Sequence, residues 1–154
     1  MICAPVGAVR SIRNAMGNNN QKIGISQKVI LFRDDGKILA LKRTAEAPSR
    51  PLRWDLPGGD LNFGEDPAQG IVREVLEETG LLVERLEPFD TEAHINKDGE
   101  FWLTIAYKSN CTSDKIKLSY EHNEFKWMTL EEFLKLESAD KLKRFVKKFI
   151  FLEK

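Results

Sequence analysis

Apolar and polar residues alternate along residues 101–108, and this is the clearest repeating pattern in the chain. A repeat of two residues is typical of a strand with one buried face. The turn sequence Asn-Lys-Asp-Gly at 96–99 precedes this stretch, so the pattern predicts a hairpin with residues 82–92. That partner strand carries Pro88, which we expect at a sheet edge or a bulge.

A second pair of strands is predicted nearer the start of the chain. Residues 23–32 turn apolar and end in Val-Ile-Leu-Phe, the turn signal Asp-Asp-Gly-Lys follows, and residues 38–41 are apolar again. We predict a hairpin of two buried strands. Lys42 and Arg43 leave the second strand, and residues 46–53 read as an exposed loop.

The C-terminal part of the chain predicts one more strand and two helices. Residues 125–128 form a short strand, after a polar connection at 109–120 that contains another short extended piece. Thr129 and Glu132 have the spacing of a capping box, which predicts the start of a helix. Between residues 141 and 152, apolar residues recur at helical spacing, which predicts an amphipathic helix that packs on the sheet.

The size and composition fit one globular domain. The chain has 154 residues, with 42% hydrophobic and 31% charged residues, and its formal net charge is zero. The zero charge argues against a surface that binds nucleic acid. The order of elements predicts an α/β fold with a mixed sheet between helices over residues 22–154. Residues 1–21 are expected to form an N-terminal arm or an extra strand.

The sequence also predicts where the protein works. No apolar run approaches the length of a membrane span, and the N-terminus lacks the layout of a signal peptide. The two cysteines, Cys3 and Cys111, form no metal-binding spacing. We therefore expect a reduced, cytoplasmic setting without a membrane partner.

Three carboxylates are predicted to gather on one helix. Asp66-Pro67 suits a helix start, and Gly80 suits a left-handed helix stop. Between them, Glu74, Glu77 and Glu78 stand at positions i, i+3 and i+4, so that Glu74 neighbours both partners. Carboxylates this close repel one another unless a cation lies between them, and Mg²⁺ prefers such oxygen ligands.

Residues before and within the helix are expected to extend this cluster of carboxylates. Glu65, at the mouth of the helix, is expected to join the carboxylates through the preceding loop. Arg73 is expected to point to a neighbouring face and to hold a glutamate by a bidentate contact. Gly58 and Gly59 allow the backbone to approach the metal region closely.

The whole stretch from Gly59 to Leu81 follows one spacing, G-x5-E-x7-R-E-U-x-E-E-x-G-U, where U is a bulky aliphatic residue. This is the complete Nudix box, so the chain resembles the Nudix hydrolases. The Pro-Gly-Gly lead-in, the helix and a glutamate ahead of Trp127 look most like the MutT-like branch. The resemblance covers residues 23–152 and implies the Nudix α/β/α sandwich.

The resemblance also implies a set of site residues. The implied metal ligands, for Mg²⁺ or Mn²⁺ in its place, are the carbonyl of Gly59 and the carboxylates of Glu74, Glu77 and Glu78. The implied catalytic residues are Glu77, Glu78 and Glu121, and one of these glutamates takes the proton from the attacking water. Lys42 and Arg43 are candidates for phosphate contacts.

Two residues near Glu121 compete with it or accompany it. Glu124 is the rival for the acidic residue that reaches the metal site from this loop. His122 is either a phosphate contact or, as is usual for a lone loop histidine, polar surface. Trp54 is expected to pack in the core or at its rim rather than to stack on a base.

The implied reaction is hydrolysis of a nucleoside diphosphate linked to another group. The default substrate is a nucleoside or deoxynucleoside triphosphate, cut to the monophosphate and pyrophosphate. The alternatives are a nucleoside diphosphate sugar, a regulator that binds nucleotides without cutting them, or the end of an RNA chain, against which the zero net charge argues weakly. Some branches of the Nudix family carry, beyond the box, a proline or a tyrosine that marks their substrate. At the corresponding distance this chain has Asn96, Lys97 and Asp98 instead. The protein is expected to be a monomer or a homodimer.

Overall fold

A mixed sheet organises the protein, whose computed structural model describes residues 22–154. The predicted N-terminal arm or extra strand at residues 1–21 lies outside the described residues. The elements are β1 (Ile23–Phe32), β2 (Ile38–Arg43), β3 (Trp54–Asp55), α2 (Pro67–Thr79), β4 (Val83–Ile95), β5 (Phe101–Cys111), β6 (His122–Met128), α3 (Leu130–Leu134) and α4 (Asp140–Leu152). The strand order is β3-β2-β1-β5-β4, with β6 paired to β2.

The sheet is mixed because β1 and β5 run parallel while the other strand pairs run antiparallel. The predicted hairpin of β4 and β5 is confirmed, and the register of β4 shifts on both sides of Pro88. β4 is also an edge strand, so both expected settings of this proline are met.

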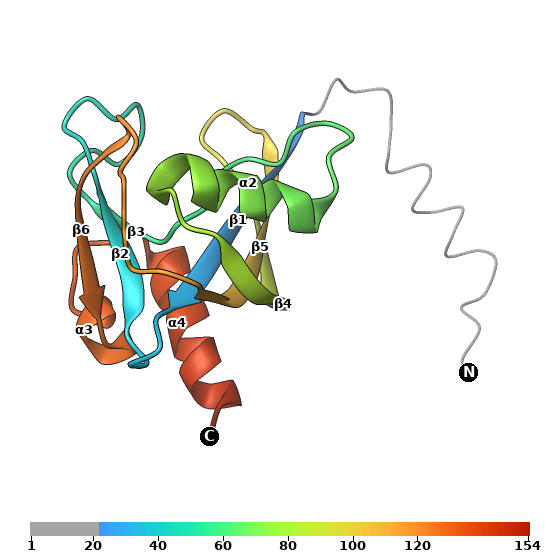
Figure 1. The fold of residues 1–154 in the computed structure, drawn as a ribbon. Helices are drawn as coiled ribbons and strands as arrows, with labels where there is room; N and C mark the ends of the chain where they lie inside the picture. Colours follow the sequence, from blue (N-terminus) through green and yellow to red (C-terminus); the bar gives the residue numbers. More distant parts are fainter. Residues whose placement is uncertain (1–21) are drawn as a thin grey trace, which may run out of the picture.

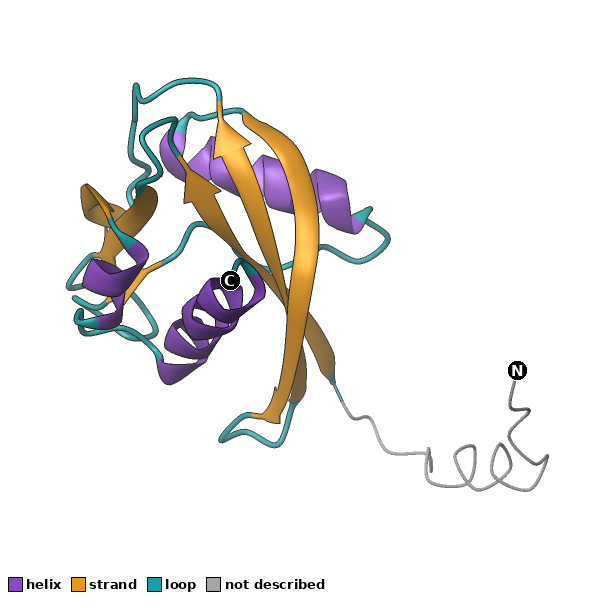
Figure 2. Cartoon of the chain, turned by 90° about the horizontal axis from the view of Figure 1, so that it is seen from below, coloured by secondary structure: helices purple, strands orange, loops and turns teal. Residues whose placement is uncertain are grey.

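Helices cover both faces of the sheet, as Figure 2 shows. On one face, Ile71 and Val75 of α2 pack with Val29 and Leu31 of β1. On the other face, α4 and α3 pack on a second cluster that contains Ile30. Successive residues of β1 point to opposite faces, so a single strand supplies both halves of the core. The predicted α/β/α sandwich is confirmed.

The predicted hairpin of β1 and β2 is correct only at its turn. The two strands pair at Phe32 and Ile38 and then diverge, as Figure 1 shows. The segment before α2 enters the opening and pairs with β1: Gln27 N–H donates to Gly59 O at 2.8 Å, and Val29 N–H donates to Pro57 O at 2.9 Å. Because β1 and β2 diverge, β1 has room to pair with the turn that contains Gly58 and Gly59.

Three other boundaries differ from the prediction. β2 continues through Lys42 and Arg43, because both pair with β6, and β6 begins at His122 instead of residue 125. The connection predicted at 109–120 begins later, because β5 continues through Cys111. The short extended piece predicted within it is not a separate strand, since no strand lies between Cys111 and β6. This connection instead donates N–H groups to the carbonyls at the end of α2, which would otherwise lack partners.

The predicted helix ends are confirmed. Asp66 accepts a hydrogen bond from Gln69 N–H, Pro67 begins α2, and Gly80 ends it in the left-handed region with φ 72°. Thr129 and Glu132 form the capping box of α3. Within residues 22–154, none of the helices has both the length and the apolar character that a membrane crossing requires.

Candidate active site

The turn Gly58–Gly59 and the helix α2 meet at the site. Glu78, near the end of α2, points inward and is only 5% exposed. Its Oε2 atom accepts a hydrogen bond of 2.9 Å from Gly58 N–H. Burial raises the pKa of Glu78 to about 8, although the charge of Lys28 and the Gly58 hydrogen bond oppose the shift. A buried carboxylate of this kind gains from a nearby cation.

Glu74 lies one turn earlier and packs directly on Gly59. A Cβ atom at Gly59 would lie 2.5 Å from the carboxyl carbon of Glu74, closer than real contacts allow. Burial raises the pKa of Glu74, the neighbouring Arg73 opposes this shift, and the charges of Glu77 and Glu121 add to it. The Glu121 side chain therefore lies within electrostatic range of Glu74, and its predicted role at the site stays a prediction.

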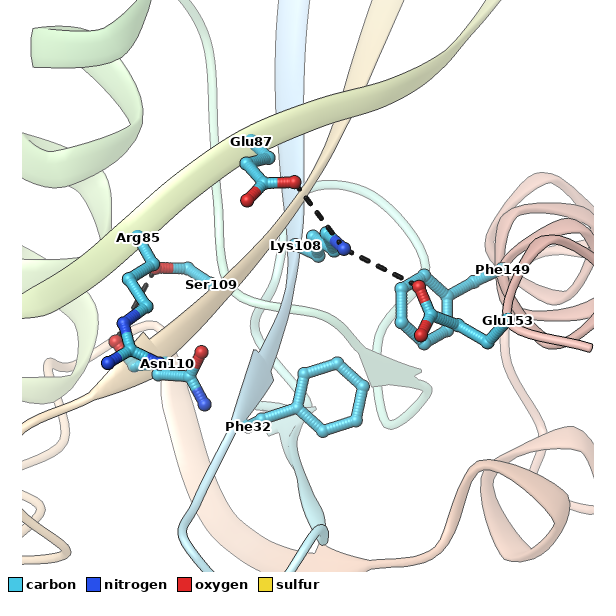
Figure 3. A pocket seen from close by; sticks show the side chains of 8 residues that line it. All are labelled: Phe32, Arg85, Glu87, Lys108, Ser109, Asn110, Phe149 and Glu153. Atoms are coloured by element: carbon cyan, nitrogen blue, oxygen red, sulfur yellow. Dashed lines mark hydrogen bonds and ion pairs between the residues drawn. The ribbon is translucent and has the colours of Figure 1, made fainter.

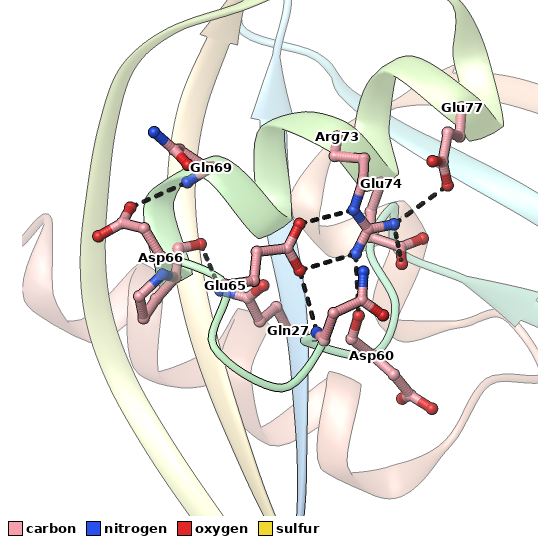
Figure 4. A network of polar contacts seen from close by, with 10 residues as sticks. Gln27, Asp60, Glu65, Asp66, Gln69, Arg73, Glu74 and Glu77 are labelled. Carbon is pink, nitrogen blue, oxygen red and sulfur yellow. Dashed lines mark hydrogen bonds and ion pairs between the residues drawn. The ribbon is translucent and has the colours of Figure 1, made fainter.

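Arg73 lies among the carboxylates instead of pointing to a neighbouring face (Figure 4). Its Nε and Nη2 atoms contact the two carboxylate oxygens of Glu65 at 2.7 and 3.0 Å, which confirms the predicted bidentate contact. Its Nη1 atom donates to Glu74 at 2.9 Å and to Glu77 at 3.2 Å. Glu65 therefore joins the cluster through Arg73.

The residues present suit a hard divalent cation. Glu74, Glu77 and Glu78 offer carboxylate oxygens, and the Gly59 carbonyl, which accepts one hydrogen bond from Gln27, has a second lone pair. Within residues 22–154, the side chains form no group of three or more acidic, histidine or cysteine residues that could hold a metal ion in their present orientations. Arg73 pairs with Glu74 and Glu77, whereas Glu78 accepts its hydrogen bond from the Gly58 N–H.

A buried ion pair between Lys28 and Asp55 lies beside the Gly58–Gly59 turn, and it was not predicted from the sequence. Lys28 in β1 contacts Asp55 in β3 at 2.8 Å, and Arg43 lies 3.4 Å from the same carboxylate. Burial alone would raise the pKa of Asp55, but the charge and hydrogen bond of Lys28 outweigh burial and hold it below its usual range. The available signal was a lysine inside an apolar strand, since a lysine is seldom fully buried unless it is paired.

The two predicted phosphate contacts already have partners in the protein. Lys42 lies 3.7 Å from Glu124 and above the ring of Trp54. Arg43 donates to Ser49 O at 2.8 Å in addition to its contact with Asp55. Trp54 is buried, which confirms its expected packing role.

The two rival glutamates lie on either side of the start of β6, with Glu121 in the preceding loop and Glu124 in the strand. Glu124 is held by Lys42 and by Lys126, at 3.7 and 3.2 Å. Glu121 is exposed and precedes the strand. His122 is buried, so the expectation of polar surface is wrong, and its Nδ1 atom has no partner among the described residues. Burial lowers the pKa of His122 to about 4.

Two hollows border the loop at 44–53. One, of about 570 Å³, is lined by Arg43, Pro48, Tyr120 and Glu121 among others. The other, of about 510 Å³, is lined by Arg50, Asp60, Trp102 and Lys141 among others. Each combines an aromatic side chain with at least one cation, which suits a nucleotide.

A third hollow lies on the α4 side of the sheet (Figure 3). It has a volume of about 500 Å³, and Phe32 and Phe149 line it. Its Lys108 is already neutralised by Glu87 and Glu153, each 3.4 Å away. None of the residues predicted for the site lines this hollow.

Comparison with known proteins agrees with this fold. The family model described as "NUDIX domain" matches residues 23–149. A bis(5'-nucleosyl)-tetraphosphatase (asymmetrical) from Caenorhabditis elegans is 33% identical over 122 residues, which cover 74% of this chain and 84% of that protein. A MutT-like protein from Streptomyces ambofaciens is 42% identical over 60 residues, which span 39% of this chain and 36% of that protein.

Among solved structures, the crystal structure of a MutT protein from Methanosarcina mazei Go1 is similar to this chain. Its TM-score is 0.77 and its sequence identity is 27%, with 89% of this chain and 99% of that chain covered. The sheet between helices and the acidic box helix define a Nudix-fold hydrolase. The chain belongs to the NUDIX domain family, in its MutT-like branch. It is a Nudix pyrophosphohydrolase, which acts on derivatives of nucleoside diphosphates, and enzymes of this family generally use divalent metal cations.

Proposed function

We propose that this protein hydrolyses a nucleoside or deoxynucleoside triphosphate to the monophosphate and pyrophosphate, with Mg²⁺ as its cofactor. The observation that carries the proposal is the burial of two carboxylates against one turn. Glu78 accepts the Gly58 N–H at 2.9 Å, and Glu74 packs on the α-carbon of Gly59. Burial raises the pKa of both carboxyl groups, and a bound divalent cation would favour their charged forms.

Mg²⁺ is the proposed ion because every candidate ligand is a hard oxygen. Glu74, Glu77, Glu78 and the Gly59 carbonyl are the residues that would hold it. When bound, Mg²⁺ offsets negative charge on phosphoryl oxygens and lowers the pKa of a water molecule. Mn²⁺ has similar ligand preferences and is expected to substitute.

The protein's own side chains then orient the reaction. Glu121 is the proposed general base, since it is exposed and its charge reaches Glu74. A box glutamate, Glu77 or Glu78, is the alternative base. Lys42 and Arg43 are proposed to contact phosphate, and Arg43 lines the same hollow as Glu121.

The nucleoside is proposed to enter the hollow beside Glu121. Tyr120, which is 89% exposed, stands at this hollow and offers a ring on which a base can stack. Base stacking on an exposed aromatic ring is worth roughly 1–3 kcal/mol and tolerates different bases. We therefore expect the protein to accept all four bases with little discrimination.

A second candidate substrate is a dinucleoside tetraphosphate. The relative from Caenorhabditis elegans, which is named for the asymmetrical cleavage of such a molecule, matches most of this chain. Two hollows border one loop, and each has an aromatic side chain and a cation, which suits a substrate with two nucleosides. A nucleoside diphosphate sugar is the remaining alternative, and a regulator that only binds nucleotides is disfavoured because the box carboxylates are all present.

The test is release of pyrophosphate and phosphate with Mg²⁺ across the four dNTPs, the NTPs, 8-oxo-dGTP, ADP-ribose, GDP-mannose and diadenosine tetraphosphate. Glu78→Gln is assayed beside Glu131→Gln, a matched control on the exposed first turn of α3. We expect pyrophosphate from a triphosphate with wild-type protein and with Glu131→Gln. Glu78→Gln should lose activity by about 100-fold or more while its fold is kept.

Other results would revise the proposal in distinct ways. Cleavage of the tetraphosphate alone would make the second candidate the function. Cleavage of a sugar nucleotide alone would keep the chemistry and change the substrate. Nucleotide binding without any turnover in Mg²⁺ would favour the regulator, and full activity in Glu78→Gln would remove Glu78 from the metal site.

A further inference from the structure

Lys28 is buried in the middle of β1, where a charged side chain is costly unless it is paired. Its Nζ atom has three partners in the protein. It lies 2.8 Å from Asp55, and it donates to the carbonyls of Leu56 and Gly58 at 3.1 and 3.3 Å. Two of these partners are backbone atoms of the segment that leads into the Nudix box.

The contacts of Lys28 continue to the candidate metal ligands. The two carbonyls that it holds flank the Pro57–Gly58 peptide, whose N–H donates to Glu78 at 2.9 Å. The Pro57 carbonyl itself accepts from Val29 N–H at 2.9 Å. Gly58 has φ +134°, and a Cβ atom at this position would lie 2.1 Å from Gln27 O and 2.9 Å from Lys28 Cα, so the turn packs closely on β1.

We propose that Lys28 is a positioning residue for the turn, holding the Gly58 N–H against Glu78 and the Gly59 carbonyl toward the metal site. The proposal rests on the proposed role of Glu78 as a metal ligand. An apolar pair in place of Lys28 and Asp55 would serve stability equally well, because burying an ion pair costs about as much as the attraction returns. What an apolar residue lacks is a donor for the two carbonyls.

The surroundings of Lys28 leave it one orientation. Asp55 attracts its ammonium group from β3, while Arg43 shares that carboxylate from β2. The charge of Lys28 also acts on Glu78 of α2, on His122 of β6 and on Lys141 of α4. The Asp55 carboxylate therefore holds the ammonium group within reach of the two carbonyls of the turn.

The experiment separates positioning from stability with three variants. Lys28→Met removes the charge and the donors at similar size. The double variant Lys28→Met with Asp55→Asn removes both charges, and the asparagine amide oxygen would still accept the Leu56 N–H that Asp55 accepts at 2.8 Å. Ile30→Ala is the matched control, because it leaves a cavity in the same strand and removes an apolar side chain, which donates no hydrogen bond to the turn.

Four readouts are taken for each variant. The thermal midpoint is measured without metal, and the exchange rate of the Gly58 amide is measured by NMR without metal. Mn²⁺ affinity is measured by electron paramagnetic resonance at 10 °C, where destabilised variants stay folded. Steady-state kcat and KM on the best substrate complete the set.

We expect Lys28→Met and Ile30→Ala to lose roughly 5–15 °C of midpoint, and the double variant to regain most of that loss. Despite the regained stability, the double variant should keep a loss of about 10–100-fold in Mn²⁺ affinity and kcat, with KM little changed. Its Gly58 amide should exchange at least about tenfold faster than in wild type. Ile30→Ala should keep the wild-type affinity and Gly58 exchange.

The opposite pattern overturns the inference. If Lys28→Met matches Ile30→Ala in Mn²⁺ affinity and Gly58 exchange, Lys28 serves stability alone, and this comparison decides the matter even where the double variant fails to fold. If Gly58 exchange responds to Lys28→Met but wild-type protein binds no Mn²⁺, Lys28 positions the turn and the proposed metal function fails instead.

Discussion

The α-carbon of Gly59 lies against the carboxylate of Glu74, so that a Cβ at this position would approach the carboxyl carbon to 2.5 Å. Gly58, one residue earlier, is also closely packed, but against backbone: its Cβ would lie 2.1 Å from the carbonyl oxygen of Gln27. The two glycines of one turn therefore serve different purposes. Gly58 allows the turn to pack on β1, and Gly59 leaves room for a candidate metal ligand.

Gly59→Ala should damage function more than stability. The added methyl group meets only the flexible end of Glu74, which will rotate away and lose its place beside Glu78. We expect the free energy of unfolding to change by less than about 1 kcal/mol, while metal-dependent turnover falls by about 100-fold. Gly58→Ala should instead lower stability by about 2 kcal/mol or more, because the clash is with backbone at a φ that disfavours alanine. Equal losses of stability in the two variants would contradict this division.

Arg73→Lys should weaken the acidic cluster. A lysine cannot reproduce the bidentate contact with Glu65 while also reaching Glu74 and Glu77, because its ammonium group is a single point charge. We expect metal affinity, measured by titration calorimetry with Mn²⁺, to fall by about 10-fold or more.

Arg144→Lys is the matched control for this change. Arg144 also donates two hydrogen bonds to one carboxylate, that of Glu92. Unlike Arg73, it lies on α4 at the exposed surface. Its loss should change stability by less than about 1 kcal/mol and leave metal affinity untouched. A similar loss of affinity in both variants would show that Arg73 acts through the general charge of the protein.

Glu121→Gln and Glu124→Gln should differ sharply. Glu124 is held by Lys42 and Lys126, whereas Glu121 is exposed at the mouth of a hollow and close enough to influence Glu74. A general base contributes about 10²–10⁴-fold, so Glu121→Gln should lower kcat within that range. Glu124→Gln should leave kcat within about twofold of wild type, a surface-charge effect. The reverse order in a steady-state assay would assign the base to Glu124.

His122 should make stability fall in mild acid. Its pKa is about 4 in the folded protein, below the ordinary value of 6.5, so the unfolded chain binds more protons between these two values. The contribution of His122 is therefore complete above pH 6.5 and is lost as pH falls toward 4. Between pH 7.5 and 5 we expect wild type to lose about 2 kcal/mol more than His122→Phe in urea unfolding. Parallel curves for the two proteins would show that the imidazole is not shielded from water.

The local elements were predictable because their signals are short in range. The cap at Asp66, the stop at Gly80 and the capping box at Thr129 each depend on residues within one helical turn. The alternation along residues 101–108 likewise reports a single strand with one buried face. These patterns, with the box spacing, were enough to predict the α/β sandwich and the family.

The failures occur where distant segments compete for one partner. The hairpin of β1 and β2 opens after Phe32 because the turn before α2 pairs with β1 in place of β2. The stretch predicted as an extended piece within 109–120 is used to cover the end of α2. Neither choice is written in the local sequence, since each depends on which backbone groups remain free elsewhere.

By itself, the sequence determined the helix that carries Glu74, Glu77 and Glu78 and the spacing that makes them neighbours, because a helix places residues by count alone. Only the tertiary structure decided that Glu78 turns inward onto Gly58, that Arg73 gathers Glu65 with the others, and that Lys28 meets Asp55 beneath the turn. The contact between Gly58 and Glu78 joins residues 20 positions apart, and the contact between Lys28 and Asp55 joins residues still further apart in the chain. Their geometry follows from how the sheet opens and what fills the opening, which no local pattern encodes.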